Sequence, residues 1–161
     1  MPHLHQQMVG QAEATDGKNF LIHPQIALTQ RGPCVQIAVS IAQPVAEQLL
    51  QRGETLPNMV SGVGLIDTGA SSTCVDIDMV TSLGIQPTDF VMVASASHEE
   101  TKQGVYPITF QIVGLPIGIN ALRSIGAPLK AQGIQLLIGR DVLQHCTLFY
   151  NGIVGQFTLS I

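Results

Sequence analysis

The chain has 161 residues, about the length of one domain, and only 11% of them are charged, against roughly 25% in an average soluble domain. A net charge of −4 and an aromatic content of 4% exclude the basic or stacking surface of a nucleic-acid partner, and no membrane partner is expected because no apolar run could span a bilayer. So few charges favour an apolar face that is buried by self-association.

The first 22 residues are polar and have no regular apolar period, so we expect residues 1–22 to be an arm or a disordered tail and residues 23–161 to be the domain. They lack the basic segment and apolar stretch of a secretory signal, which favours a cytoplasmic protein. The cysteines form an odd, sparse set, Cys34, Cys74 and Cys146. We expect three free thiols and no disulfide framework.

The first half of the domain alternates between strand and helix signals. We predict a first strand over residues 25–30 and a second over residues 34–42, where β-branched residues alternate with others. Residues 43–53 carry a proline at position 44 and end in a glycine, which predicts a short helix. Residues 63–67, "VGLID", are apolar at nearly every position and predict an interior strand.

A short helix and a long hairpin follow. "DIDMVTSLG" predicts a helix capped by Asp76 or Asp78 and closed by Gly84. Two strands, starting near Phe90 and Val105, then surround the polar stretch "SASHEETKQG". We expect this hairpin to have a long hydrophilic tip.

The last part of the chain predicts a buried strand in "QLLI", a turn at Gly139 and a short helix over residues 140–145. A terminal hairpin follows, for which Asn151 and Gly152 are the turn signal. Many short strands with few helices are typical of a mainly β domain and not of a repeated strand–helix–strand array.

The stretch "GLIDTGASST" places one aspartate, Asp67, at the end of an apolar strand. A carboxylate there loses hydration unless hydrogen-bond donors surround it, and Gly69 lets the backbone turn sharply enough to supply them. Hydrolysis of a peptide bond by carboxylates needs two of them, one as the base and one as the acid. The motif therefore raises the question of where the second carboxylate lies.

"LIDTGAS", followed further along by "LLIGRDVL", resembles the retropepsin-type aspartic proteases over about residues 25–161. The resemblance implies a mainly β, closed-barrel fold with one or two short helices and a flap hairpin. It implies a C2 homodimer in which Asp67 meets its own copy, and an endopeptidase that activates water on peptide or protein substrates without metal or other cofactor.

The resemblance also implies roles for individual residues. Asp67 is the expected catalytic residue, supported by Thr68, Gly69, Gly139 and Arg140. The expected substrate-binding residues lie in the motif and at the hairpin tip: Gly69, Ala70, Ser71, Ser72, Ala96, Ser97 and His98.

Two features depart from the family. Ser71 and Ser72 stand where retroviral members carry two acids, so Arg140 lacks its usual partner, and Asp76, Asp78 or Asp141 remain open as substitutes. Residues 43–61 look like an insertion that flanks the cleft or joins the dimer interface. The alternative function is therefore a non-catalytic, dimeric peptide-binding or assembly module.

Other chemical signals are weaker. "DIDMV" matches a phosphotransferase pattern, but that chemistry needs a parallel α/β sheet, and helix capping explains both acids better. Cys74 has no basic neighbour in sequence, so packing explains it better than nucleophilic catalysis. The five histidines form no spaced set of metal ligands, so no metal site is expected.

Overall fold

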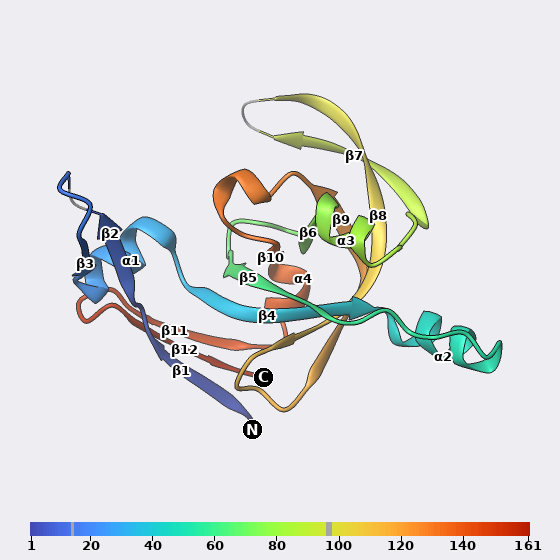
Figure 1. The fold of residues 1–161 in the computed structure, drawn as a ribbon, viewed down its shortest axis with the longest axis horizontal. Helices are drawn as coiled ribbons and strands as arrows, with labels where there is room; N and C mark the ends of the chain where they lie inside the picture. Colours follow the sequence, from blue (N-terminus) through green and yellow to red (C-terminus); the bar gives the residue numbers. More distant parts are fainter. Residues whose placement is uncertain (14, 96–97) are drawn as a thin grey trace.

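The structure, a computed structural model, describes residues 1–13, 15–95 and 98–161. Its main sheet has the strand order β4-β5-β10-β6-β9-β8-β7. These strands are β4 (Cys34–Ile41), β5 (Val60–Ile66), β6 (Cys74–Asp76), β7 (Asp89–Ser95), β8 (His98–Ile112), β9 (Gly118–Ala127) and β10 (Leu136–Ile138). Because β4 also pairs with β8, every strand of this sheet except β7 belongs to a closed barrel (Figure 1). The predicted fold class, a mainly β closed barrel, is confirmed.

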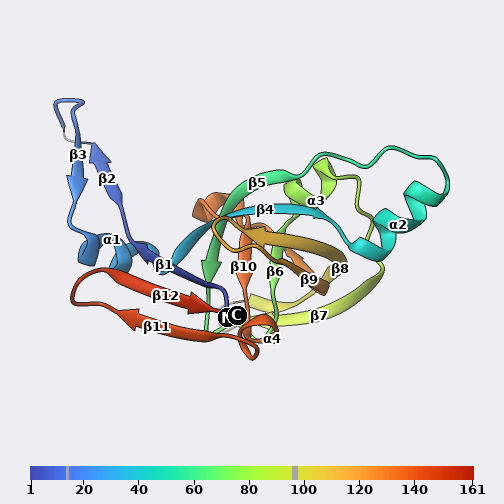
Figure 2. The same cartoon turned by 90° about the horizontal axis from the view of Figure 1, so that it is seen from below.

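The ends of the chain form a second, three-stranded antiparallel sheet of β1 (His3–Gln7), β12 (Gln156–Ser160) and β11 (Thr147–Asn151). The two termini lie side by side in Figures 1 and 2, and the N–H of Ile161 donates to the carbonyl of Pro2 at 3.1 Å. A separate hairpin, β2 (Gly10–Glu13) with β3 (Asn19–Ile22), projects from the body (Figure 1). Residues 1–22, expected as an arm or a tail, thus include one strand of the terminal sheet and a projecting hairpin.

The described residues contain four α-helices and one short 3-10 helix, more than the one or two that were expected. They are α1 (Pro24–Arg31), α2 (Gln43–Gln51), α3 (Ile77–Ser82), α4 (Arg140–Leu143) and the 3-10 helix η1 (Lys130–Gln132). None of the described helices is both long and apolar enough to cross a bilayer.

Helix α1 replaces the strand predicted over residues 25–30, and that prediction was wrong. Pro24 occupies the first turn, the ring of His23 accepts from the N–H of Gln25 at 3.3 Å, and Gly32 ends the helix with φ of 71°. A proline in the first turn and a glycine after the last are typical of a helix rather than a strand. The apolar pattern that indicates a helix is short in this segment, because only Ala27 and Leu28 of α1 are buried.

Most other predicted elements are present. Residues 34–42 contain β4, residues 43–53 contain α2, and α3 is capped by Asp76 as one of the two alternatives stated. Strand β9 was not predicted, yet it pairs with both β6 and β8 and is needed to close the barrel.

The hairpin of β7 and β8 has a shorter tip than was predicted. Residues of the polar stretch continue β8, and Thr101, Lys102 and Gln103 pair with strand β7. The terminal hairpin also differs in its turn, because residues 152–155 form a longer connection in which Gly155, with φ of 67°, takes the left-handed conformation. Asn151 is instead the last residue of β11.

The core fills the barrel. Along β4 the buried side chains alternate with less buried ones, as expected for a strand with one face inward. Its inward residues meet those of β8 and β10, and the largest fully buried side chains include Phe110, Ile37, Ile108, Leu136 and Ile138. Burying each such side chain stabilises the fold by about 1.5–3 kcal/mol. This packing holds β5 and β10, which carry the candidate site, in fixed register.

Candidate active site

Asp67 follows directly on β5, at the edge of the barrel where two parallel strands end together. Strands β5 and β10 run parallel, with Gly64 opposite Leu136 and Ile66 opposite Ile138. The N–H of Asp67 donates to the carbonyl of Ile138 at 3.0 Å, which continues the pairing one residue further. Strand β10 lies between β5 and β6, so the loop over residues 67–73 passes around the end of β10.

The Asp67 carboxylate is half-buried and receives a backbone donor from its own loop. The N–H of Gly69 donates to Oδ1 of Asp67 at 2.8 Å. A Cβ at position 69 would lie 3.1 Å from the same oxygen, so a larger residue would crowd the carboxylate. Gly69 therefore has the close approach that its place in the motif predicted, while Thr68 and Gly69 both face solvent.

Arg140 braces this loop through backbone carbonyls. Its Nη1 donates to the carbonyls of Thr68 at 2.9 Å and Gly69 at 3.1 Å, and its backbone N–H donates to the carbonyl of Ala70 at 3.0 Å. None of the ion pairs among the described side chains includes Arg140. The carbonyl oxygens of the loop thus stand in for the acidic partner that the sequence lacks.

The three acids left open as partners of Arg140 have other contacts. Asp76 caps α3, Asp78 pairs with Lys130 at 3.0 Å, and Asp141 binds Thr73.

Thr73 and Asp141 form a second brace, which the sequence analysis missed. The Thr73 hydroxyl donates to Oδ1 of Asp141 at 2.8 Å and accepts from the N–H of Gly139 at 3.2 Å, while the N–H of Thr73 donates to Oδ2 of Asp141 at 3.0 Å. Thr73 is fully buried. Two features of the sequence could have indicated this contact: Thr73 ends "DTGASST", and Asp141 directly follows the Gly-Arg pair.

Gly139 lies where two backbones touch. A Cβ at this position would be 2.5 Å from the carbonyl carbon of Ser72 and 2.8 Å from the nitrogen of Thr73. Only a glycine lets the end of β10 come this close to the loop. The structure thus brings Gly139 and Arg140 together with residues 67–73.

Ser71 and Ser72 line a hollow of about 520 Å³ beside the loop. Its other walls come from the hairpin and the barrel: Val91, Met92, Val93, Val105, Arg123, Ile125 and Asp141. The β7–β8 hairpin arches over this side of the barrel (Figure 1). The remaining predicted substrate-binding residues cannot be placed there, since Ala96 and Ser97 lie outside the described residues and only the backbone of His98 is described.

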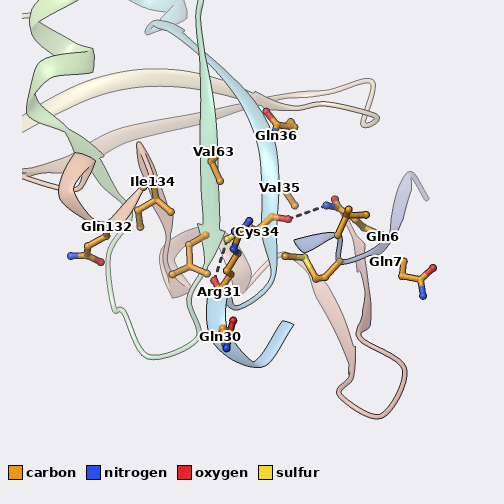
Figure 3. Close-up of a pocket in the computed structure, with 14 residues that line it drawn as sticks. Gln6, Gln7, Gln30, Arg31, Cys34, Val35, Gln36, Val63, Gln132 and Ile134 are labelled. Atoms are coloured by element: carbon orange, nitrogen blue, oxygen red, sulfur yellow. Dashed lines mark hydrogen bonds between the residues drawn. The ribbon is translucent and has the colours of Figure 1, made fainter. Parts of the chain in front are cut away.

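A larger hollow, of about 820 Å³, adjoins β5 from another direction (Figure 3). It is lined by β1, the end of α1, the start of β4, residues 132–134, and Val63 and Leu65 of β5. Leu65 stands two residues before Asp67 in the chain, and Asp67 itself is not among the lining residues. The hollow therefore adjoins β5 near the end of the strand that Asp67 follows.

Cys74 does not have the properties of a nucleophile. Burial, together with the nearby carboxylates of Asp141 and Asp67, raises the pKa of its thiol to about 11. The thiol is therefore protonated at neutral pH, whereas nucleophilic cysteines have a lowered pKa. Its Sγ donates to the carbonyl of Ser72 at 3.7 Å, a contact that fits a packing role.

The insertion lies away from the site. Helix α2 precedes β5 while Asp67 follows it, so the length of the strand separates them, and Figures 1 and 2 both place α2 at the far end of the body. Within one copy of the chain, the helix of residues 43–61 does not flank Asp67, contrary to one of the two roles expected for it.

Comparison with known proteins gives a likeness in fold alone. No family model and no curated protein matches the chain. Among solved structures, a retropepsin-like aspartic protease from Rickettsia conorii aligns with a TM-score of 0.46 and 13% identity, over 99% of this chain and 94% of that chain. The identity is too low, and the superposition too loose, for residue roles to be transferred from that protein.

Proposed function

We propose that this chain is an aspartic endopeptidase, in which Asp67 of two copies form one catalytic pair. The observation that carries the proposal is the position of the Asp67 carboxylate. It lies half-buried at the joint end of two parallel strands, with the Gly69 N–H on one oxygen and Arg140 bracing its loop. The sequence around it, "LIDTGAS" with "LLIGRD", supports the same chemistry.

The need for a second copy follows from the acids of the chain itself. Asp141, which binds the loop over residues 67–73, has both oxygens engaged by Thr73 and accepts from the N–H of Val142 as well. A C2 dimer supplies a second Asp67 without any new residue. The exposed Thr68 and Gly69 are then available to contact the copy and the substrate backbone.

The pair would act by general acid–base catalysis. Two carboxylates in contact share one proton because they cannot both ionise. The ionised one takes a proton from water, whose oxygen attacks the peptide carbonyl carbon, and the protonated one gives its proton to the carbonyl oxygen. The tetrahedral species then breaks its C–N bond as a proton passes to the leaving amine. This scheme needs no cofactor.

In this proposal the substrate is a peptide or protein held along Gly69, Ala70, Ser71 and Ser72. The β7–β8 hairpin covers it as a flap, and the hollow lined by Ser71 and Ser72 receives part of it. We also propose that the enzyme works in the cytoplasm.

The test is the substitution Asp67→Asn, which keeps the size of the side chain but removes the base. We expect peptide cleavage to fall by at least about a hundredfold, the range of a lost general acid–base group. Circular dichroism and sedimentation velocity should match the wild type. The control is Asp78→Asn, a similar change at an exposed acid outside the site. An Asp67→Asn protein that keeps its activity would remove the assignment.

The second candidate function is a dimeric peptide-binding or assembly module without catalysis. The serines at positions 71 and 72, where the family carries acids, favour it. A purified protein that binds members of a peptide library but cleaves none, from acidic to neutral pH, would support this function over the first.

A further inference from the structure

The larger hollow has a lining that the proposed catalytic chemistry does not explain. Five of the 14 residues drawn in Figure 3 carry carboxamides: Gln6, Gln7, Gln30, Gln36 and Gln132. Only one lining residue, Arg31, carries a charge. The rest of the wall is mostly apolar and includes Val35, Leu65 and Ile134. A cavity with one cation, several amides and an aliphatic wall fits a ligand that has a single negative charge on an apolar stem.

Arg31 is held next to the strand that presents Asp67. The following residue, Gly32, turns the chain, and a Cβ there would lie 2.7 Å from the Leu65 side chain. The carbonyl of Pro33 accepts the N–H of Ile66 at 3.1 Å, one residue before Asp67. The segment after α1 is thus attached to the end of β5, the strand that directly precedes Asp67.

The groups around Arg31 leave its charge unmatched. Its side chain is exposed, and the ion pairs among the described side chains lie elsewhere in the molecule. Cys34 shares the hollow, but burial raises the pKa of its thiol despite the opposing effect of Arg31, so the thiol stays neutral. Gln6 donates from Nε2 to the carbonyl of Cys34 at 3.1 Å, which fixes one of the amides in the wall.

We propose that this hollow is the subsite for an acidic side chain of the substrate, whose carboxylate pairs with Arg31. A guanidinium matches a carboxylate with two parallel N–H donors, and carboxamide groups supply further donors without adding charge. The methylene groups of the substrate side chain lie against the apolar wall. The inference rests on the proposed peptidase function, since it assigns one of that enzyme's substrate positions.

The first test compares peptides from a positional-scanning library with Glu or Gln fixed at one position at a time. We expect wild-type kcat/KM to favour Glu at one position by about tenfold or more, the size of a charge-assisted contact. Arg31→Gln should remove that preference. The matched control is Arg52→Gln, an exposed arginine at the end of α2 and outside the hollow, which should keep it. Equal cleavage of both peptides by the wild type, or a preference that persists in Arg31→Gln, would overturn the proposal.

A second measurement separates the subsite from the catalytic proposal. Fluorescein-labelled Glu and Gln peptides are titrated by anisotropy with the Asp67→Asn protein, with and without Arg31→Gln. If the wild type cleaves neither peptide, and the Glu peptide still binds more tightly in the presence of Arg31, the result supports the subsite and contradicts the peptidase function. If the wild type cleaves both peptides equally well, the result supports the peptidase function and contradicts the subsite. Added salt should reduce the Glu preference of wild type, because it screens an exposed pair.

Discussion

Two aspartates that are two residues apart show how burial decides what a carboxylate does. Asp76 is only 3% exposed, and its oxygens accept three backbone N–H groups, from Asp78, Leu129 and Lys130. It therefore caps α3 and attaches η1 at the same time. Asp78 is exposed and pairs with the Lys130 side chain. These contacts explain "DIDMV" as a structural element, in agreement with the preference for helix capping over phosphotransfer.

We predict that Asp76→Ala lowers the free energy of unfolding by about 2–4 kcal/mol, because it removes a helix cap and leaves buried N–H groups without acceptors. Asp78→Ala should change it by less than about 0.5 kcal/mol, as expected for an exposed ion pair. Urea denaturation followed by circular dichroism measures both. Equal losses in the two variants would contradict the difference assigned to burial.

At the scale of elements, the site depends on how closely the end of β10 approaches the loop over residues 67–73. Gly139 makes this approach possible, although its own φ of −89° suits any residue. The constraint at this position is space and not conformation. A methyl group there would have to displace backbone atoms of Ser72 and Thr73, and with them the bonds of Thr73 to Asp141.

We predict that Gly139→Ala destabilises the protein by about 1–3 kcal/mol, the usual cost of overpacking, and weakens activity further because the loop shifts. The control is Gly118→Ala in β9, where the added carbon would meet only the Thr109 side chain at an ordinary 3.4 Å. Thermal denaturation and peptide cleavage report the two effects. A Gly139→Ala protein as stable and active as Gly118→Ala would show that the loop tolerates the displacement.

The elements that the sequence predicted well are those whose signals are local. Strand β4 has its alternation, α3 its Asp76 cap, and α4 its preceding glycine. Helix α1 was mistaken because its apolar pattern is short and its end signals were not weighed. Strand β9, "GINALRSIGA", has little pattern of its own and becomes a strand through pairing with β6 and β8.

The candidate site divides in the same way. Asp67, Gly69, Gly139 and Arg140 stand in two motifs and were predicted from them. The contact of Thr73 with Asp141 and the carbonyl partners of Arg140 were not predicted, because they exist only once β10 lies between β5 and β6. The spacing of these segments in the sequence does not indicate that β10 lies between β5 and β6.

At the scale of the whole molecule, the low charge content leaves apolar side chains on the surface. Strand β11 is an edge of the terminal sheet, and it presents Phe149, 62% exposed, and Tyr150, 48% exposed. An edge strand with unpaired backbone groups and apolar side chains favours association with another chain. This agrees with the proposal that two copies act together.

If the active species is a dimer with one shared site, wild-type protein equilibrated with an equal amount of Asp67→Asn should keep about half the activity of the same wild type alone, because mixed dimers lack one carboxylate. A monomeric enzyme would keep all of it. Specific activity of the wild type should also rise with protein concentration, in step with dimer formation measured by sedimentation velocity. Full activity in the mixture would contradict the shared site.

The position of β10 has a consequence for folding during synthesis. Strands β5 and β6 are synthesised before β10, the strand that lies between them. Arg140 and Asp141, which brace the loop over residues 67–73, also leave the ribosome only near the end of the domain. Pairing between segments so distant in sequence is slow, because a long loop has to close before the contacts can form. A nascent or truncated chain that ends before β10 therefore contains Asp67 but lacks the residues that hold its loop in place. The candidate site can form only after the barrel is complete.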